Sequence, residues 1–233
     1  MIAAMDRSAC SPASASLTRL AAAYLEQLLA GNRRGACALV LDAVRAGADV
    51  REIYLKVLQP VQHEVGRLWQ ENTITVAVEH FCTAATQLVI SQLFPYIITE
   101  TKHGLSMVGC CVGEELHELG MRMVCDFFEM DGWDTYYMGA NCPQDAVLAA
   151  MAERRPHALC LSVTMHQNVP LARDIIQAVA TQFPAVKILV GGFPFLLNPD
   201  LAASLGAHGW ARDAHEGVRL AAFLCRADQE DAA

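Results

Sequence analysis

The second half of the chain alternates short apolar runs with helical patterns, and this alternation limits the possible folds more than any other feature. Five such runs are separated by segments in which apolar residues recur every three or four positions. Strands that alternate with helices favour parallel pairing, because parallel strands need a long crossover. We therefore predict a five-stranded parallel sheet covered by helices on both faces, over residues 104–228. The predicted strands are Leu105–Val112, Trp133–Met138, Ala158–Val163, Lys187–Val190 and Gly206–Trp210.

The first half lacks these runs and has helical periodicity throughout. Residues 17–98 are rich in Ala, Leu, Glu and Gln, and the short connections favour a four-helix bundle. Asp49 and Glu52 have the spacing of a helix cap. Pro60 is expected to bend its helix, and Pro95 to end the last one. The predicted helices run from Leu17 to Leu29, Cys37 to Val44, Asp49 to Trp69 and Thr75 to Phe94.

Composition argues against several classes of protein. The formal net charge is -8, and no basic run is longer than Arg33-Arg34 or Arg154-Arg155, which argues against direct nucleic-acid binding. No apolar stretch is long enough to predict a membrane span. Residues 1–16 are small and polar and lack the features of a secretory signal, so we expect a disordered terminus. The nine cysteines form no Cys-x-x-Cys pair, which favours a reduced, cytoplasmic protein.

Three short motifs follow predicted strands of the second half. Glu115-Leu116-His117-Glu118-Leu119-Gly120 comes after the first strand, Ser162-Val163-Thr164 ends the third, and Gly191-Gly192 ends the fourth. Because the carboxyl ends of parallel strands meet at one edge, the motifs are expected to lie together where such sheets bind ligands. A loop histidine there suits a transition metal such as cobalt, and a carboxylate two residues away can fix its tautomer.

The order and spacing of these motifs resemble those of the cobalamin-binding Rossmann-like domain. Residues 121–161 separate the first two motifs, and residues 165–190 separate the last two. The motif of that domain is Asp-x-His-x-x-Gly, then Ser-x-Leu or Ser-x-Thr, then Gly-Gly. The resemblance implies a flavodoxin-like Rossmann domain that binds cobalamin through His117 as the lower cobalt ligand. Glu115 stands where the family has Asp, which leaves open whether its carboxylate reaches His117.

The same resemblance implies roles for the other motif residues. Gly120 lets the start of a helix approach the corrin, and Ser162 bonds the free nitrogen of the displaced dimethylbenzimidazole tail. Thr164 lies on the same side of the chain as Ser162. Gly191 and Gly192 let the nucleotide tail lie against the backbone. Taken singly, each residue also fits an ordinary loop, strand end or turn, and the joint spacing carries the prediction.

The helical half carries a further signature. Trp69, followed ten residues later by Glu79-His80, resembles the Trp, Glu and His of the light-sensing adenosylcobalamin regulators of the CarH type. The resemblance implies that the bundle caps the upper face of cobalamin, with these three residues around the upper ligand. Core packing of Trp69 and His80 is the alternative. Gln70 replaces the histidine that follows the Trp in those regulators, so the ligand after light is open between water, His80 and His63.

Two functions follow from these resemblances. The first is a cobalamin-binding light sensor, not an enzyme and without a catalytic residue, that binds adenosylcobalamin and signals as a homo-oligomer or through a separate regulatory protein. Stand-alone sensors of this kind include photocobilins, so a bilin such as biliverdin is a second candidate cofactor. The alternative is a corrinoid methyl carrier of a cobalamin-dependent methyltransferase system. A third possibility is a sensor that has lost cobalamin and binds haem or another tetrapyrrole. Candidate walls for a bilin are Tyr136, Tyr137, Phe193 and Phe195.

Overall fold

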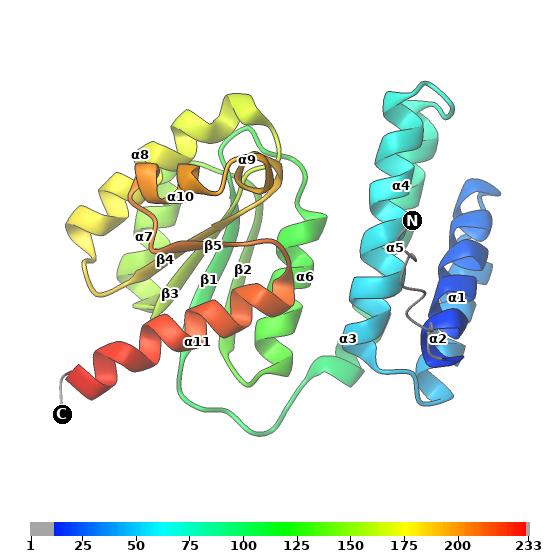
Figure 1. Cartoon of the computed structure of the whole chain (residues 1–233), viewed down its shortest axis with the longest axis horizontal. Helices are drawn as coiled ribbons and strands as arrows, with labels where there is room; N and C mark the ends of the chain where they lie inside the picture. The colour runs from blue at the N-terminus through cyan, green and yellow to red at the C-terminus, as the bar shows by residue number, and fades with distance from the viewer. Residues whose placement is uncertain (1–11, 232–233) are drawn as a thin grey trace, which may run out of the picture. The chain divides into compact units, whose positions relative to one another are not determined.

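Two compact units make up the chain, which divides between Tyr96 and Ile97 in the computed structural model (Figure 1). The structure describes residues 12–231, and the side chains of residues 16–226. The expected disordered terminus therefore lies mostly outside the described residues. Its last part is helical, because the first helix begins at Pro12 and not at Leu17. Proline suits a first helical turn, where its fixed φ is favourable and its missing N–H would be unpaired in any case.

The first unit is helical, as predicted. It contains α1 (Pro12–Leu29), α2 (Arg33–Arg45), a long helix in three consecutive segments, and α5 (Val76–Ile97). The three segments are α3 (Val50–Ile53), the π-helical turn Tyr54–Leu58 and α4 (Gln59–Gln70). The Asp49 side chain caps α3 by accepting from the backbone N–H groups of Arg51 and Glu52. Apolar side chains from every segment of this unit are buried and form its core.

Pro60 and Pro95 both lie within helical segments of this unit, and only Pro95 differs from the prediction. Pro60 lies in the first turn of α4, directly after the π-helical turn in which the Gln59 N–H donates to the Tyr54 carbonyl. The wider turn moves the preceding carbonyl groups away from the proline ring, so the helix continues through a change of hydrogen-bonding register. Pro95 does not end α5, which runs on to Ile97. A proline this close to the end removes one backbone hydrogen bond and leaves the last residues free to stay helical.

The second unit is a parallel sheet with helices on both faces. Its strands are β1 (Ser106–Val112), β2 (Asp134–Cys142), β3 (Ala158–Ser162), β4 (Lys187–Gly191) and β5 (Gly209–Ala211). Their order is β2-β1-β3-β4-β5, the predicted flavodoxin-like order (Figure 1). One face is covered by α6 (Leu119–Met130) and α11 (Ala214–Asp231), and the other by α7 (Gln144–Arg154), α8 (Val169–Gln182) and α10 (Asp200–Leu205). The short helix α9 (Phe193–Leu197) follows β4.

Two strand ends differ from the prediction. β2 runs four residues past Met138, through Gly139 and Asn141, which both have positive φ. A glycine and an asparagine usually mark the end of a strand, but here they lie in irregularities of its pairing with β1. β5 begins at Gly209, because Gly206 has a φ of +87° and ends α10.

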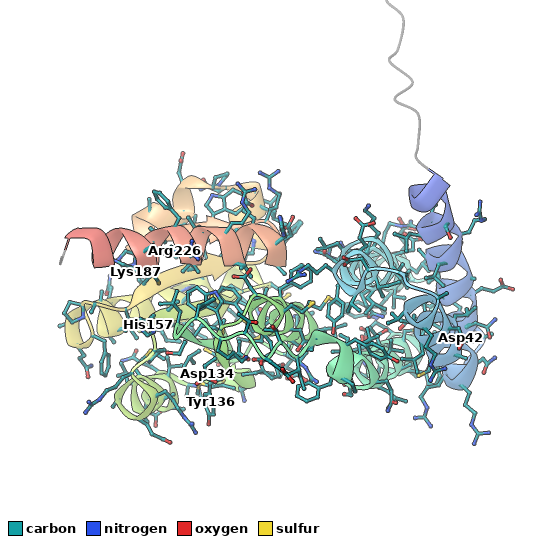
Figure 2. All side chains as sticks on the ribbon, turned by 90° about the horizontal axis from the view of Figure 1, so that it is seen from below. Asp42, Asp134, Tyr136, His157, Lys187 and Arg226 are labelled. Atoms are coloured by element: carbon teal, nitrogen blue, oxygen red, sulfur yellow. The ribbon has the colours of Figure 1, made fainter. Side chains whose placement is uncertain are left out.

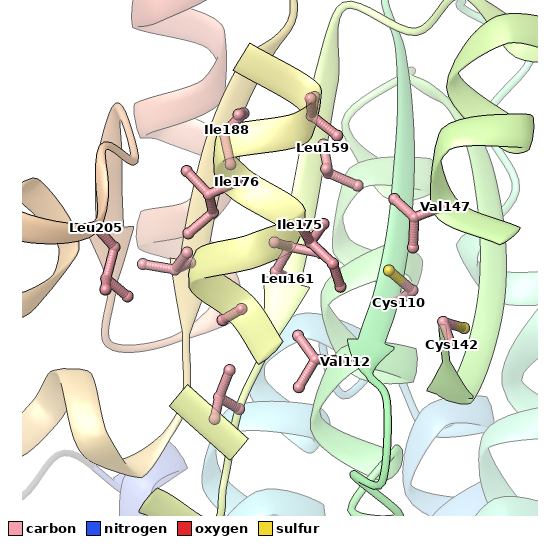
Figure 3. Close-up of a cluster of buried hydrophobic side chains, with 14 of the residues drawn as sticks. Cys110, Val112, Cys142, Val147, Leu159, Leu161, Ile175, Ile176, Ile188 and Leu205 are labelled. Carbon is pink, nitrogen blue, oxygen red and sulfur yellow. The ribbon is translucent and has the colours of Figure 1, made fainter. Parts of the chain in front are cut away.

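One large part of the core of this unit lies between the sheet and the helices that follow β2 and β3. Val112 and Leu161 from the strands meet Val147 of α7 and Ile175 of α8 in one buried cluster (Figure 3). The eight cysteines of the described part are free thiols, and seven of them are buried. Among the described helices, none combines the length and apolar character that crossing a membrane requires.

Candidate functional site

The three sequence motifs meet at the carboxyl edge of the sheet. Cys111 of β1 pairs with Ser162 of β3, and Ser162 pairs with Gly191 of β4. The loops that follow these strands therefore leave the sheet side by side. β1 is followed by the loop that carries Glu115 and His117. This placement confirms the prediction that the motifs share one edge.

His117 is held by the carboxylate of Glu115. The His117 Nδ1 lies 2.5 Å from Oε1 of Glu115, and the His117 backbone N–H donates to the same oxygen at 3.2 Å. The Glu115 side chain is fully buried, whereas 54% of the His117 side chain is exposed. An ionised carboxylate only accepts, so Nδ1 carries the proton and Nε2 keeps a free lone pair. The extra methylene of Glu relative to Asp therefore does not prevent the contact that the sequence left open.

The second oxygen of Glu115 ties this residue to the loop after β3. Its Oε2 accepts from the backbone N–H groups of Thr164 and Met165, both at 2.8 Å, and from the Asn168 side-chain amide at 3.2 Å. Burial raises the pKa of Glu115, but these hydrogen bonds and those from His117 outweigh it and lower the pKa to about 2. The carboxylate is therefore ionised at neutral pH. Thr164 contributes its backbone N–H to this network.

Asn168 is a site residue that sequence reasoning missed. Its side chain is buried, with an exposed fraction of 1%, and it belongs to the turn before α8. In the sequence, an Asn one residue before Val169-Pro170 is typical of a helix start and does not point to a carboxylate more than fifty positions away. Only the fold brings it to Glu115.

The remaining motif residues have different surroundings. Ser162 is buried at the end of β3, where its side chain hydrogen-bonds the Cys111 thiol. Gly192 has a φ of +109°, and a Cβ there would lie 1.9 Å from the Val163 carbonyl oxygen, so the protein backbone itself requires glycine. A Cβ on Gly191 would lie 3.4 Å from a carbonyl oxygen, and one on Gly120 would meet no atom within 4 Å. The space around Gly120 at the start of α6 is therefore open, and close approach of a corrin there stays a prediction. Contact of the two glycines with a nucleotide tail stays a prediction.

Exposed apolar side chains lie in the segments that follow β1, β3 and β4, at the same edge of the sheet as the His117 loop. The set comprises Leu116, with an exposed fraction of 72%, Met165 after β3, and Phe193, Leu196 and Leu197 after β4. Large apolar groups that gather at one edge while exposed to water mark a ligand or partner surface. Here they offer an apolar ligand a surface at the edge of the sheet that carries the His117 loop. Apart from Phe193, the sequence did not single them out, because single exposed apolar residues are common.

The four aromatic residues considered as bilin walls do not come together. Phe195 is fully buried in the core. Tyr136 lies on β2 (Figure 2), with its ring 4.1 Å from the Arg154 guanidinium, and the neighbouring Tyr137 hydroxyl donates to Glu118. β2 is separated from β4, which carries α9, by two intervening strands. That spacing amounts to roughly 14 Å at about 4.8 Å per strand, too far for one shared wall.

Trp69 lies near the end of α4 in the first unit, and Glu79 and His80 lie in the first turns of α5. A loop of only five residues, 71–75, joins the two helices, so the three residues share one end of a helical hairpin. Trp69 is 42% exposed and is therefore not a core aromatic. Glu79 Oε2 lies 2.6 Å from His80 Nδ1, and Glu79 Oε1 accepts from the Thr83 hydroxyl at 2.9 Å. Their placement around an upper cobalt ligand stays a prediction.

Metal chemistry at His117 would involve a single protein ligand. Within the described part of the chain, no group of three or more His, Cys, Asp or Glu side chains is arranged to hold a metal ion. A metal bound through one imidazole needs its other ligands from elsewhere, as a tetrapyrrole-like macrocycle supplies them. The solitary histidine, its carboxylate partner and the apolar surface at this edge therefore fit cobalt in a corrin.

Both halves of the chain match protein-family models described as "B12 binding domain". One match covers residues 105–219 and the other covers residues 20–93. The first interval contains the Glu115 and His117 loop, and the second contains Trp69, Glu79 and His80. The matched segments thus include every residue that the sequence singled out for cofactor binding.

Similar proteins of known function include transcriptional repressors and corrinoid proteins. The HTH-type transcriptional repressor CarH of Myxococcus xanthus is 26% identical over 72% of this chain, but the chain spans only 56% of that protein. Dimethylamine corrinoid protein 1 of Methanosarcina acetivorans is 24% identical over 82% of this chain and 91% of that protein. The structure of the Methanosarcina barkeri monomethylamine corrinoid protein superimposes with a TM-score of 0.78 at 19% identity and covers 87% of this chain and 97% of that one. At this identity the likeness confirms the fold.

Proposed function

Because this chain is a cobalamin-binding protein, we propose that His117 is the lower ligand of the cobalt and that the dimethylbenzimidazole tail of the cofactor is displaced from it. The contact between Glu115 and His117 is the observation that carries the proposal. It leaves Nε2 as the free nitrogen of a half-exposed imidazole, and it makes that nitrogen a stronger donor to a metal. Ser162 and the Gly191-Gly192 turn, which leave the same edge, are the proposed contacts of the displaced tail.

The protein supplies binding, orientation and exclusion of water, and the cofactor supplies a cobalt–carbon bond that light can break. Glu115 fixes the tautomer and the direction of the imidazole. The backbone N–H groups of Thr164 and Met165 hold Glu115 in place. The apolar surface at this edge of the sheet lowers the local dielectric and strengthens this ion-dipole network.

We infer that the bound cofactor, with adenosyl as its upper ligand, acts as a light sensor. Trp69 is a large apolar ring that is free of the core, and Glu79 gives the same end of the hairpin a carboxylate whose direction is fixed by Thr83. Together they offer a ligand both an apolar cover and a polar contact. Trp69 and Glu79 would hold the upper ligand, and loss of these contacts in the light would let the protein signal through a change in self-association or in binding of a separate protein.

The sensor is tested by loading the protein with adenosylcobalamin in the dark and illuminating it. Absorption spectra and size-exclusion profiles are compared before and after light. The proposal expects a dark-stable complex whose spectrum and elution volume both change. Trp69→Ala should weaken dark retention of the cofactor, whereas Phe223→Ala, which removes a 70% exposed aromatic of α11, should not. A loaded protein whose elution volume and circular-dichroism spectrum are both unchanged by light would refute the sensor.

A corrinoid methyl carrier is the second candidate, because the chain matches corrinoid proteins over most of their length. The chain spans nearly the whole of the dimethylamine and monomethylamine corrinoid proteins but little more than half of CarH. A carrier must pass its upper ligand to a partner enzyme. Methylcobalamin-loaded protein that gives its methyl group to a thiol in the presence of a methyltransferase, with no response to light, would favour the carrier over the sensor.

A further inference from the structure

The edge strand β2 contains two more residues than the stretch of β1 that it pairs with. Gly109 pairs with Tyr137, but the next residue of β1 pairs with Gly139, and Val112 pairs with Cys142. Met138 and one further residue between 139 and 142 are therefore extra. Such bulges re-aim side chains beside functional sites, and an edge strand tolerates them because its outer side has no partner strand. The extra residues lie next to the loop that carries His117.

Asn141 joins the second irregularity to the start of that loop. Its backbone N–H donates to the Glu115 carbonyl at 2.9 Å, and its side-chain oxygen accepts from the Glu114 N–H at 2.9 Å. Asn141 has a φ of +52° and Glu114 a φ of +63°. Non-glycine residues with positive φ are strained, and strain of this kind clusters at functional sites. Asn141 thus donates to Glu115 and accepts from the neighbouring Glu114, and these two hydrogen bonds form a fixed joint between β2 and the loop.

Tyr137 and Gly139 hold the other end of the loop. The Tyr137 hydroxyl donates to Glu118 Oε2 at 3.0 Å, and a Cβ on Gly139 would lie 3.3 Å from the same oxygen. Burial and the Glu118 carboxylate both raise the pKa of Tyr137, so its hydroxyl remains a donor. β2 thus contacts the loop at residues 114–115 and again at residue 118, on both sides of His117.

We propose that the end of β2 positions the metal-ligating loop, and that Asn141 and Tyr137 are positioning residues for His117. Glu115 can bond His117 with one oxygen and the β3 loop with the other only if its own backbone is fixed. Asn141 supplies that constraint, because it hydrogen-bonds both the carbonyl group of Glu115 and the backbone N–H of Glu114. The inference rests on the proposed role of His117 as a cobalt ligand.

The joint is tested first in the cofactor-free protein by amide hydrogen exchange. Asn141→Ala removes the acceptor of the Glu114 N–H and places alanine at a strained φ, so that amide should exchange about fivefold faster, the size expected for one lost hydrogen bond. Asn141→Gly tolerates the φ but also lacks the acceptor, and it separates the two effects. Arg155→Ala is the matched control. Arg155 also has a positive φ, of +47°, but it lies between α7 and β3, at the amino ends of the strands and away from the His117 loop.

The second measurement is the absorption spectrum at saturating hydroxocobalamin. Wild type should show the histidine-ligated form, and its share should fall in Asn141→Ala and in Tyr137→Phe but not in Arg155→Ala. Tyr137→Phe keeps the ring and serves if Asn141→Ala does not fold. A wild-type protein that binds hydroxocobalamin without histidine ligation would overturn the proposed role of His117. A different result would overturn the positioning role: histidine ligation in wild type, together with spectra and a Glu114 amide exchange rate in the variants that equal those of wild type.

Discussion

Replacement of Glu115 by Gln tests the physical basis of the site, because both carboxylate oxygens of Glu115 face only donors. Oε1 faces the Nδ1–H and backbone N–H of His117, and Oε2 faces three donors of the β3–α8 connection. Gln has the same length, but its NH₂ group must occupy one of these two positions. At least two donors then lose their acceptor and meet another donor. A buried donor without an acceptor costs about 1–3 kcal/mol.

The lowered pKa of Glu115 gives a second value for the folding free energy that these hydrogen bonds contribute. Burial raises this pKa, yet the hydrogen bonds bring it from the ordinary value of 4.5 down to about 2. A shift of that size corresponds to about 3 kcal/mol of folding stability. The folded-state pKa is the lower one, so the contribution is complete above about pH 4.5 and is lost as the pH falls from there towards about 2.

The assay is urea unfolding of the cofactor-free protein, followed by circular dichroism over a range of pH. Glu115→Gln is expected to be about 3 kcal/mol less stable than wild type near pH 7, and this gap should narrow below about pH 4.5. Glu114→Gln changes an exposed neighbouring carboxylate and should cost little at any pH. Equal stability of wild type and Glu115→Gln near pH 7, or a gap that widens in acid, would refute the reasoning.

Substitutions at four further positions have expected effects on stability. Gly192→Ala should cost more than about 3 kcal/mol in thermal unfolding, because its Cβ would overlap the Val163 carbonyl, whereas Gly120→Ala, at an open position, should be neutral or stabilising. Asn168→Ala should cost about 1 kcal/mol in urea unfolding and raise the pKa of the site carboxyl, since one donor is lost. Thr83→Val should lower the melting temperature of the first unit by removing the hydroxyl between α4 and α5, and Thr83→Ser should restore it. An equal melting temperature for the Val and Ser variants would contradict this.

The sheet and the position of the site could be predicted from the sequence because they follow from short-range patterns. Apolar runs that alternate with helical segments fix a parallel sheet, and the strand ends then bring Glu115, Ser162 and Gly191 to one edge. The contact of Glu115 with His117 lies within three residues of the chain. The family resemblance pointed to a carboxylate at this position, and only the structure shows that the longer Glu115 side chain reaches His117.

Contacts between residues far apart in the sequence could not be predicted in this way. Asn168 reaches Glu115, and Asn141 reaches Glu114, only because the loops of different strands leave the sheet together. We interpreted Gly192 as a position where the missing side chain leaves space for a ligand. A Cβ added there would instead collide with the backbone of Val163. The path of the chain at Pro60 depends on a π-helical turn, which no local pattern indicated.

Electron paramagnetic resonance of the protein loaded with cob(II)alamin tests the central claim most directly, because the unpaired electron on cobalt couples to the nucleus of its lower nitrogen ligand. The measurement compares protein grown with ordinary histidine with protein grown with ¹⁵N-histidine, each carrying unlabelled cofactor. Ligation by His117 predicts that the nitrogen splitting changes from a triplet to a doublet on labelling, and that the doublet disappears in His117→Ala. A triplet that persists in the labelled protein would show that the dimethylbenzimidazole nitrogen remains the ligand and would contradict the account.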